Sequence, residues 1–156
     1  MQGRECALRA LLSFALLFAS IGFASAAEPM IRTVRVPFSI DESIRLDTTA
    51  GELKIRDLRV KRDDRSLIDQ ALPPRGGQSR FSWLSYAIYA ENTSAAASNL
   101  MARVKLFDAN GAVIDEFEMR GRIWRGRAEI VDLRRITLNY VIPLIHEVEI
   151  ALTVTP

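Results

Sequence analysis

Short segments in which apolar and polar residues alternate, separated by turn-forming residues, run through most of this chain and restrict it to β-structure. The clearest segment lies near the C-terminal end, where Val148, Ile150 and Leu152 alternate with Glu147 and Glu149. Successive side chains of a strand point to opposite faces, so a period of two gives one apolar and one polar face. This segment therefore predicts an antiparallel strand with one buried face.

Turn signals divide the remaining sequence into further segments of the same kind. Residues 31–38 and 44–46 look like one edge strand in two pieces, and residues 128–133 and 136–141 form one stretch before the last strand. Seven to eight strands without sustained helical periodicity predict an all-β fold, an antiparallel β-sandwich. About 130 residues bury enough surface for packing alone to stabilise one such domain.

The apolar pattern changes parity between residues 53 and 60. Leu53 and Ile55 share one face of a strand, whereas Leu58 and Val60 have the opposite parity. One extra residue in the strand returns all four side chains to the core. The sequence therefore predicts a β-bulge near residues 56–57.

A hairpin is predicted around the dipeptide Asn-Gly at residues 110–111, which suits a two-residue type I′ turn. That turn places opposite charges across from each other, Lys105 with Glu116 and Arg103 with Glu118. The other face of the hairpin is then apolar, and a shift by one residue would move charges into the core. Asp115 is the residue that does not fit this pattern.

The segments around this hairpin resemble a known family. An aromatic strand from Trp83 is followed by Asn92-Thr93-Ser94, an alternating strand from Ala102, and an aromatic-Asp-x-x-Gly sequence that ends at Gly111. This order resembles the FxLYD-type, fibronectin III-like sandwiches of exported bacterial proteins, although a clear Gly-rich strand before the Asn is lacking. The resemblance implies an immunoglobulin-like Greek key and a binding or accessory role, with no catalytic residues.

Residues 1–26 predict a helical secretory signal peptide. Arg4 and Arg9 form a basic start, residues 10–23 form an apolar run, and residues 24–26 read Ala-Ser-Ala, which a signal peptidase accepts. We therefore expect a single mature domain at residues 27–156, periplasmic or secreted, with no transmembrane span after cleavage. The alternative is an uncleaved anchor, because 18 residues without charge reach the lower limit for spanning a membrane.

A long polar loop is predicted at residues 62–79, where Pro-Pro and Gly-Gly pairs disfavour a strand. Residues 66–69 have the spacing of a capping box and predict one helical turn within it. A loop of this length is either a functional surface or a flexible spacer.

Composition argues against several classes of function. Without the leader the chain has 19 basic and 18 acidic residues, and this near-neutral balance argues against a nucleic-acid partner. Cys6, the only cysteine, leaves with the leader, and the turn at residues 108–111 lacks the Glu that would complete a calcium loop. His146 is the sole histidine and is interpreted as structural because no nucleophile motif accompanies it. We expect no metal, no cofactor, no catalytic residues and no enzymatic activity.

The segment from residue 120 to residue 127 is the local composition that suggests a ligand. It places four arginines around one tryptophan: Arg120, Arg122, Trp124, Arg125 and Arg127. Arginine binds phosphate or carboxylate oxygens and an indole stacks on rings, so an anionic glycan or lipid would fit. The competing interpretation is a solvated turn with Trp124 anchored in the core and the charge neutralised by nearby acidic residues.

A second candidate contact lies in the aromatic strand. Trp83 and Tyr89 share one parity, and Leu84, Tyr86 and Ile88 share the other. If the first set is exposed, it forms an aromatic platform for a sugar or a partner strand. If loops cover it, both faces of the strand are buried.

Two functions follow from these observations. The first is an exported interaction or assembly accessory module of the cell envelope, whose partner is another envelope protein bound at a strand edge or the long loop. The alternative is a binder of anionic envelope glycan or lipid through residues 120–127.

Overall fold

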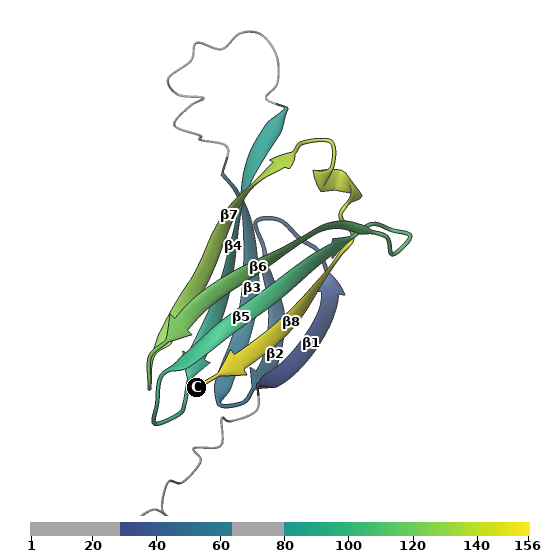
Figure 1. Cartoon of the computed structure of the whole chain (residues 1–156). Coiled ribbons are helices and arrows are strands. Elements are labelled where there is room, and N and C mark those ends of the chain that lie inside the picture. The colour runs from purple at the N-terminus through teal and green to yellow at the C-terminus, as the bar shows by residue number, and fades with distance from the viewer. Residues whose placement is uncertain (1–28, 64–79) are drawn as a thin grey trace, which may run out of the picture.

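The computed structural model describes residues 29–63 and 80–156. These residues form two four-stranded antiparallel sheets that pack face to face (Figure 1). Sheet A has the order β1-β8-β5-β6 and sheet B the order β2-β3-β4-β7. The strands are β1 (Met30–Pro37), β2 (Ser43–Ala50), β3 (Leu53–Asp63), β4 (Phe81–Asn92), β5 (Ser98–Phe107), β6 (Val113–Ile123), β7 (Ala128–Leu138) and β8 (Glu147–Thr155).

The prediction of an all-β sandwich is confirmed. The signal peptide predicted at residues 1–26 and the helical turn predicted at residues 66–69 lie outside the described residues, as does most of the predicted loop. β3 continues to Asp63, so the strand occupies the beginning of the range expected to be loop. No helix of the described part is long and apolar enough to cross a membrane.

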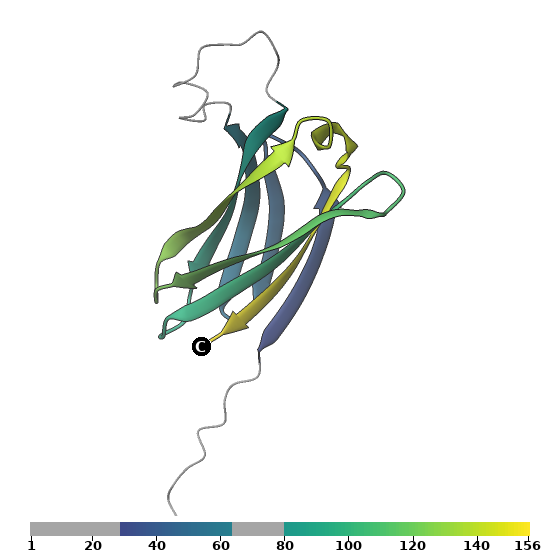
Figure 2. The same cartoon turned by 45° about the horizontal axis from the view of Figure 1, so that its top comes forward.

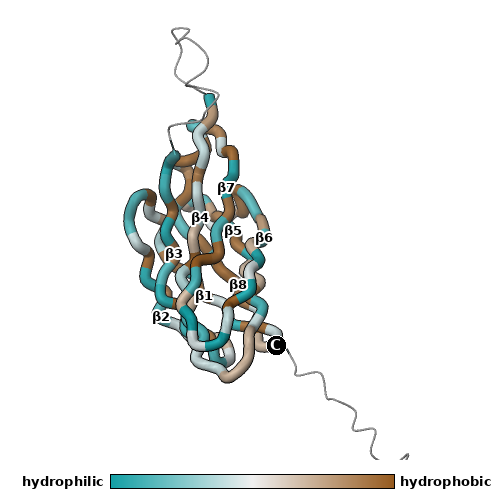
Figure 3. The backbone as a smooth tube through the Cα atoms, turned by 90° about the vertical axis from the view of Figure 1, so that its left-hand side faces the viewer, coloured by the Kyte–Doolittle hydropathy of each residue, from teal (hydrophilic) through white to brown (hydrophobic). Residues whose placement is uncertain are grey.

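The core lies between the sheets and is built from alternate residues of the strands. Val148, Ile150 and Leu152 of β8 are fully buried, as the alternation predicts. The alternation of hydrophilic and hydrophobic positions can be followed along the strands in Figure 3. His146 precedes β8 and is exposed, and its backbone N–H donates to the carbonyl of Phe107 at 2.8 Å.

The predicted two-piece edge strand is wrong. Its pieces are β1 and β2, which are edge strands of different sheets (Figure 2). Between them, the N–H of Phe38 donates to the carbonyl of His146, beside β8, and the N–H of Asp41 donates to the carbonyl of Val60 in β3. Residues 38–42 therefore carry the chain from sheet A to sheet B, which the polar break in the sequence did not reveal.

The bulge predicted in β3 is confirmed. The register of β3 against β4 shifts between Ile55 and Asp57. As a result Leu53, Ile55, Leu58 and Val60 are all buried. β2 carries a second irregularity, between Arg45 and Thr48, that the sequence did not predict.

The hairpin register is confirmed, but the predicted turn type is wrong. Only Gly111 has a positive φ in this turn, whereas a type I′ turn needs two such residues. The N–H of Gly111 donates to the carbonyl of Asp108, and the N–H of Asp108 donates to the carbonyl of Ala112, which closes a three-residue loop. Ile114 then has no opposite residue in β5, and this bulge restores the predicted pairing from Leu106 onward.

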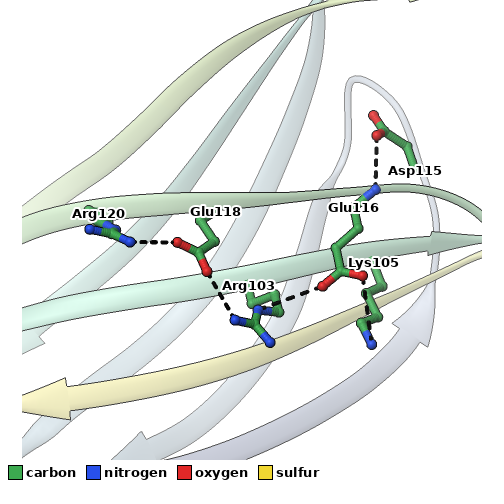
Figure 4. A network of polar contacts seen from close by, with 6 residues as sticks. All are labelled: Arg103, Lys105, Asp115, Glu116, Glu118 and Arg120. Atoms are coloured by element: carbon green, nitrogen blue, oxygen red, sulfur yellow. Dashed lines mark hydrogen bonds and ion pairs between the residues drawn. The ribbon is translucent and has the colours of Figure 1, made fainter.

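The charged pairs of this hairpin form a network on the outer face of sheet A (Figure 4). Arg103 lies 3.1 Å from Glu118 and 3.6 Å from Glu116, while Lys105 lies 3.9 Å from Glu116 and Arg120 lies 2.7 Å from Glu118. Hydrogen bonds from Arg120 and Arg103 hold the pKa of Glu118 below its usual range. Exposed ion pairs contribute little to stability, so the main effect of the network is to fix the register.

Asp115, which the hairpin pattern left unexplained, has its partner on the other sheet. Its carboxylate lies 3.1 Å from the guanidinium of Arg135 in β7, and that guanidinium lies over the ring of Phe117. Burial raises the pKa of the neighbouring Tyr86, and the charge of Asp115 raises it further. The ion pair between Asp115 and Arg135 links β6 to β7, the neighbouring edge strands of the two sheets.

Candidate interaction surfaces

The arginine-tryptophan segment forms the end of β6 and the turn into β7. Gly126 has a φ of 62°, and the N–H of Arg127 donates to the carbonyl of Trp124 at 3.2 Å, so the chain reverses tightly here. The side chain of Trp124 is 51% exposed. The interpretation that Trp124 is anchored in the core is therefore wrong, because the strand ends at Ile123 and the indole belongs to the turn.

The charge of this segment is only partly neutralised. Arg120 pairs with Glu118, and the guanidinium of Arg122 stacks over the ring of Trp124 at 4.6 Å. Within residues 29–63 and 80–156, Arg122, Arg125 and Arg127 have no carboxylate partner. Trp124, Arg125 and Arg127 line a shallow hollow of about 330 Å³. This turn is therefore a cationic surface with one open aromatic ring.

Trp83 and Tyr89 lie elsewhere, on the outer face of sheet B. Leu84, Tyr86 and Ile88 face the core, so the other parity faces outward, and Trp83 and Tyr89 are half-buried. Ile136 lies opposite Trp83 in β7, and Ile130 lies opposite Tyr89. These isoleucines are 56% and 52% exposed, so the described part of the chain does not cover this face.

The free side of β7, here called the β7 edge, is the feature that sequence reasoning missed. Among the described strands, β7 pairs with β4 alone, in an unbroken register over its whole length. At the two ends of this ladder, the N–H of Asn92 donates to the carbonyl of Arg127, and the N–H of Asn139 donates to the carbonyl of Arg80. Odd-numbered residues therefore bond to β4, and even-numbered residues of β7 direct their N–H and C=O groups outward. The signal in the sequence was that Ile130 and Ile136 share the parity of Asp132 and Arg134, so that two large apolar side chains lie on the same face as two charged ones.

A second hollow lies at the end of the sandwich where β1 begins and β8 finishes. Its volume is about 420 Å³ and its lining is largely apolar, from Met30, Ala95, Ala96, Ala97, Val154 and Pro156. Its neighbour Asn92, the first residue of Asn-Thr-Ser, is 1% exposed. The Asn92 amide donates to the carbonyls of Ala96 and Ile123, and its oxygen accepts from the N–H of Ser94. Asn92 therefore holds the β4–β5 connection in place.

The described residues offer no cluster of metal ligands. No three of their His, Cys, Asp or Glu side chains gather closely enough to hold an ion. His146 lies exposed beside the backbone of Phe38 and Phe107. Among the described side chains, Tyr86, Glu91 and Glu118 have shifted pKa values, and Arg56 lowers the pKa of Glu91 through a hydrogen bond.

Comparison with known proteins gives structural similarity but no family. No family model matches the chain, and no curated protein matches it. Among solved structures, the enzymatically active domain of tailspike protein 4 from bacteriophage CBA120 is similar to 80% of this chain, with 10% sequence identity and a TM-score of 0.27. The chain spans 17% of the length of that protein.

This similarity corrects the expectation that the chain is not an enzyme. The similar domain is described as enzymatically active, which contradicts that expectation, and we withdraw it. A TM-score of 0.27 carries no argument about a particular activity. We therefore assign no reaction and no catalytic residue to this chain.

Proposed function

We propose that this protein is an exported interaction or assembly module of the cell envelope, and that it binds a strand of an envelope protein through the β7 edge. The observation that supports this proposal is an edge strand of 11 residues, β7, whose free side has no partner strand in the described structure and which carries two isoleucines that are more than half exposed. An added strand gains affinity from main-chain hydrogen bonds and specificity from alternate side chains.

The other three edge strands are less suited to accept a partner. β1 ends in Pro37, which has no N–H, and β2 has an irregular register after Arg45. β6 carries the bulge at Ile114 and a row of charged side chains on its outer face. Proline, bulges and charges protect sheet edges from pairing. β7 has neither a proline nor a bulge, and its outer face carries two charged side chains against four on β6.

Export and the finer fold class are part of the same proposal. The basic start, apolar run and Ala-Ser-Ala of residues 1–26 support delivery to the periplasm or the outside of the cell. The return of β7 to lie beside β4, after β5 and β6 in the other sheet, supports an immunoglobulin-like Greek key of the FxLYD or fibronectin III kind.

Site-specific photocrosslinking in the producing cells tests whether the β7 edge binds a protein. A crosslinker at Ile130 is expected to give a discrete adduct, whereas one at Val113, equally exposed but at the start of β6, gives none. Adding Asp132→Pro should abolish the adduct, because residue 132 directs its N–H outward and the ladder with β4 stays intact. Equal adducts at both positions, or an adduct that survives the proline, would contradict the proposal.

The second candidate function is the binding of an anionic envelope glycan or lipid at the β6–β7 turn. It is favoured by the exposed Trp124, with Arg122 stacked on it and with Arg125 and Arg127 free of acidic partners in the described structure. Guanidinium groups would bind phosphate or carboxylate oxygens while the indole covers a ring or an acyl boundary.

Charge reversal tests this candidate. The double variant Arg122→Glu and Arg125→Glu is expected to bind envelope extract at least about tenfold more weakly and to lose the salt dependence of binding. The matched control is Arg45→Glu with Lys54→Glu, which makes the same change in net charge on sheet B and should bind like the parent. Unchanged binding and salt dependence in the first variant would remove this function.

A further inference from the structure

We propose that the strand bound at the β7 edge is β7 of a second copy of this chain, antiparallel to the first about a two-fold axis at Leu133. The inference rests on the proposed function, because it names the partner at the same edge. In a symmetric antiparallel pair, each side chain on the outer face of one strand lies opposite a side chain of the same strand in the second copy, read in reverse order. The strand must therefore carry a sequence that is complementary to its own reverse. β7 meets this requirement.

The outward backbone groups limit the registers that a second copy can adopt. Even-numbered residues of β7 direct N–H and C=O groups away from β4, so hydrogen bonds between two copies must join even-numbered residues to even-numbered residues. An axis at Leu133 satisfies this condition, because it places Asp132 opposite Arg134 of the second copy. The even-numbered side chains all lie on the outer face of sheet B, where Trp83 and Tyr89 also lie.

Charge selects one register among those allowed. With the axis at Leu133, the outer-face order Ile130, Asp132, Arg134, Ile136 meets its own reverse: each acid faces an arginine and each isoleucine faces an isoleucine. Moving the axis to Asp132 sets two aspartates against each other, and moving it to Arg134 sets two arginines against each other. Opposite charges across strands stabilise a pair, and like charges destabilise it by a similar amount.

The side chains of β7 are available for this pairing. The Asp132 carboxylate has no hydrogen-bond or ion-pair partner within the described chain. The guanidinium of Arg134 lies 3.3 Å from Asp63, but its side chain is 66% exposed, so it can also reach across the edge. Pairing covers Ile130 and Ile136. It also brings the part of sheet B around Tyr89 in one copy next to the part around Trp83 in the other copy.

β6 shows why charge symmetry alone does not suffice. Its outer face also carries two acids followed by two arginines, but both acids already bind Arg103, and Arg120 binds Glu118. Each of these pairs would have to be shared or broken in a symmetric contact. The same face of β6 has no exposed isoleucine to cover, so β7 is the better edge for a second copy.

Sedimentation of the purified protein with charge-reversed variants tests the proposal. The parent is expected to form dimers, and Asp132→Arg or Arg134→Asp, each of which creates two like-charge pairs by symmetry, should weaken the dimer at least about tenfold. Equimolar mixing of the two variants should restore dimers that contain one chain of each variant. In such a dimer, each charged pair across the edge joins an arginine to an aspartate. A monomeric parent, or variants that dimerise as the parent does, would overturn the proposal.

Thermal unfolding of each variant controls for a general loss of structure, and cysteine pairs report the register. In a Cys6→Ala background, a mixture of Ile130→Cys and Ile136→Cys chains should form a disulfide-linked dimer on mild oxidation, and Asp132→Cys chains alone should not. A bond between Asp132→Cys chains would contradict the register with the axis at Leu133.

The mass of the Ile130 photoadduct separates this inference from the proposed function. An adduct of twice the chain mass supports the second copy. An adduct with another envelope protein overturns the inference but keeps the β7 edge as a binding site. Failure to form any adduct overturns both.

Discussion

Asn92→Asp is expected to lower the free energy of unfolding by about 3 to 5 kcal/mol at pH 7, although the two side chains have the same shape. The Asn92 amide donates to the carbonyls of Ala96 and Ile123 at 2.9 and 3.0 Å, in a site that is 1% exposed. A carboxylate would direct negative charge at these two carbonyl oxygens and would have no donor to offer.

The pH dependence of this loss identifies its cause. Burial and the facing carbonyls favour the neutral acid, so the introduced carboxyl has a higher pKa in the folded chain than in the unfolded one. The loss should therefore be smallest below about pH 3, where the group is protonated in both states, and should grow as the pH rises. Urea unfolding followed by circular dichroism at about pH 3 and pH 7 measures this difference.

The matched control is Asn110→Asp, which makes the same chemical change in an exposed turn. It should alter stability by less than about 0.5 kcal/mol at either pH. An Asn92→Asp loss that is small, or equal at both pH values, would mean that the amide hydrogen bonds do not hold the β4–β5 connection.

Gly121→Ala is expected to lower the free energy of unfolding by about 1 to 3 kcal/mol. A Cβ at residue 121 would lie 2.4 Å from one methyl of Val131 and 3.1 Å from the other. Gly121 lies in β6 and the buried Val131 in β7, so the glycine allows these strands of different sheets to approach just before the turn at Trp124. The added methyl would push the sheets apart at the site of the candidate ligand.

Combining Gly121→Ala with Val131→Ala tests this explanation. Removing the two valine methyls relieves the clash, so the double variant should be more stable than the sum of the single losses by at least about 1 kcal/mol. The control combination is Gly121→Ala with Val148→Ala, a core position in β8, where the two losses should add. An additive result for the Val131 pair would show that the clash is not the source of the loss.

Features that depend on neighbouring residues could be predicted from the sequence. The bulge in β3 followed from the parity change between Ile55 and Leu58, and the hairpin register followed from the charges of β5 and β6. The turn type could not be predicted from these charges. A three-residue loop followed by the bulge at Ile114 gives the same pairing of charged residues as a two-residue turn would.

Features that depend on distant residues could not be predicted in this way. β1 pairs with β8, more than a hundred residues away, so its separation from β2 has no local signal. The partner of Asp115 on β7 and the exposure of Trp124 both depend on how β6 crosses to the other sheet. The β7 edge depends on strand order, which alternation within one segment does not specify.

The central place of β8 in sheet A affects the order of folding events. β8 lies between β1 and β5, so the earliest and latest described strands of the chain meet in one sheet. Contacts between residues so far apart in sequence slow folding, and β1 has no strand partner until Glu147–Thr155 has been synthesised. An incomplete chain therefore lacks the middle strand of sheet A. Under the proposed export in extended form, this delay would keep the chain competent for export until β8 has been made.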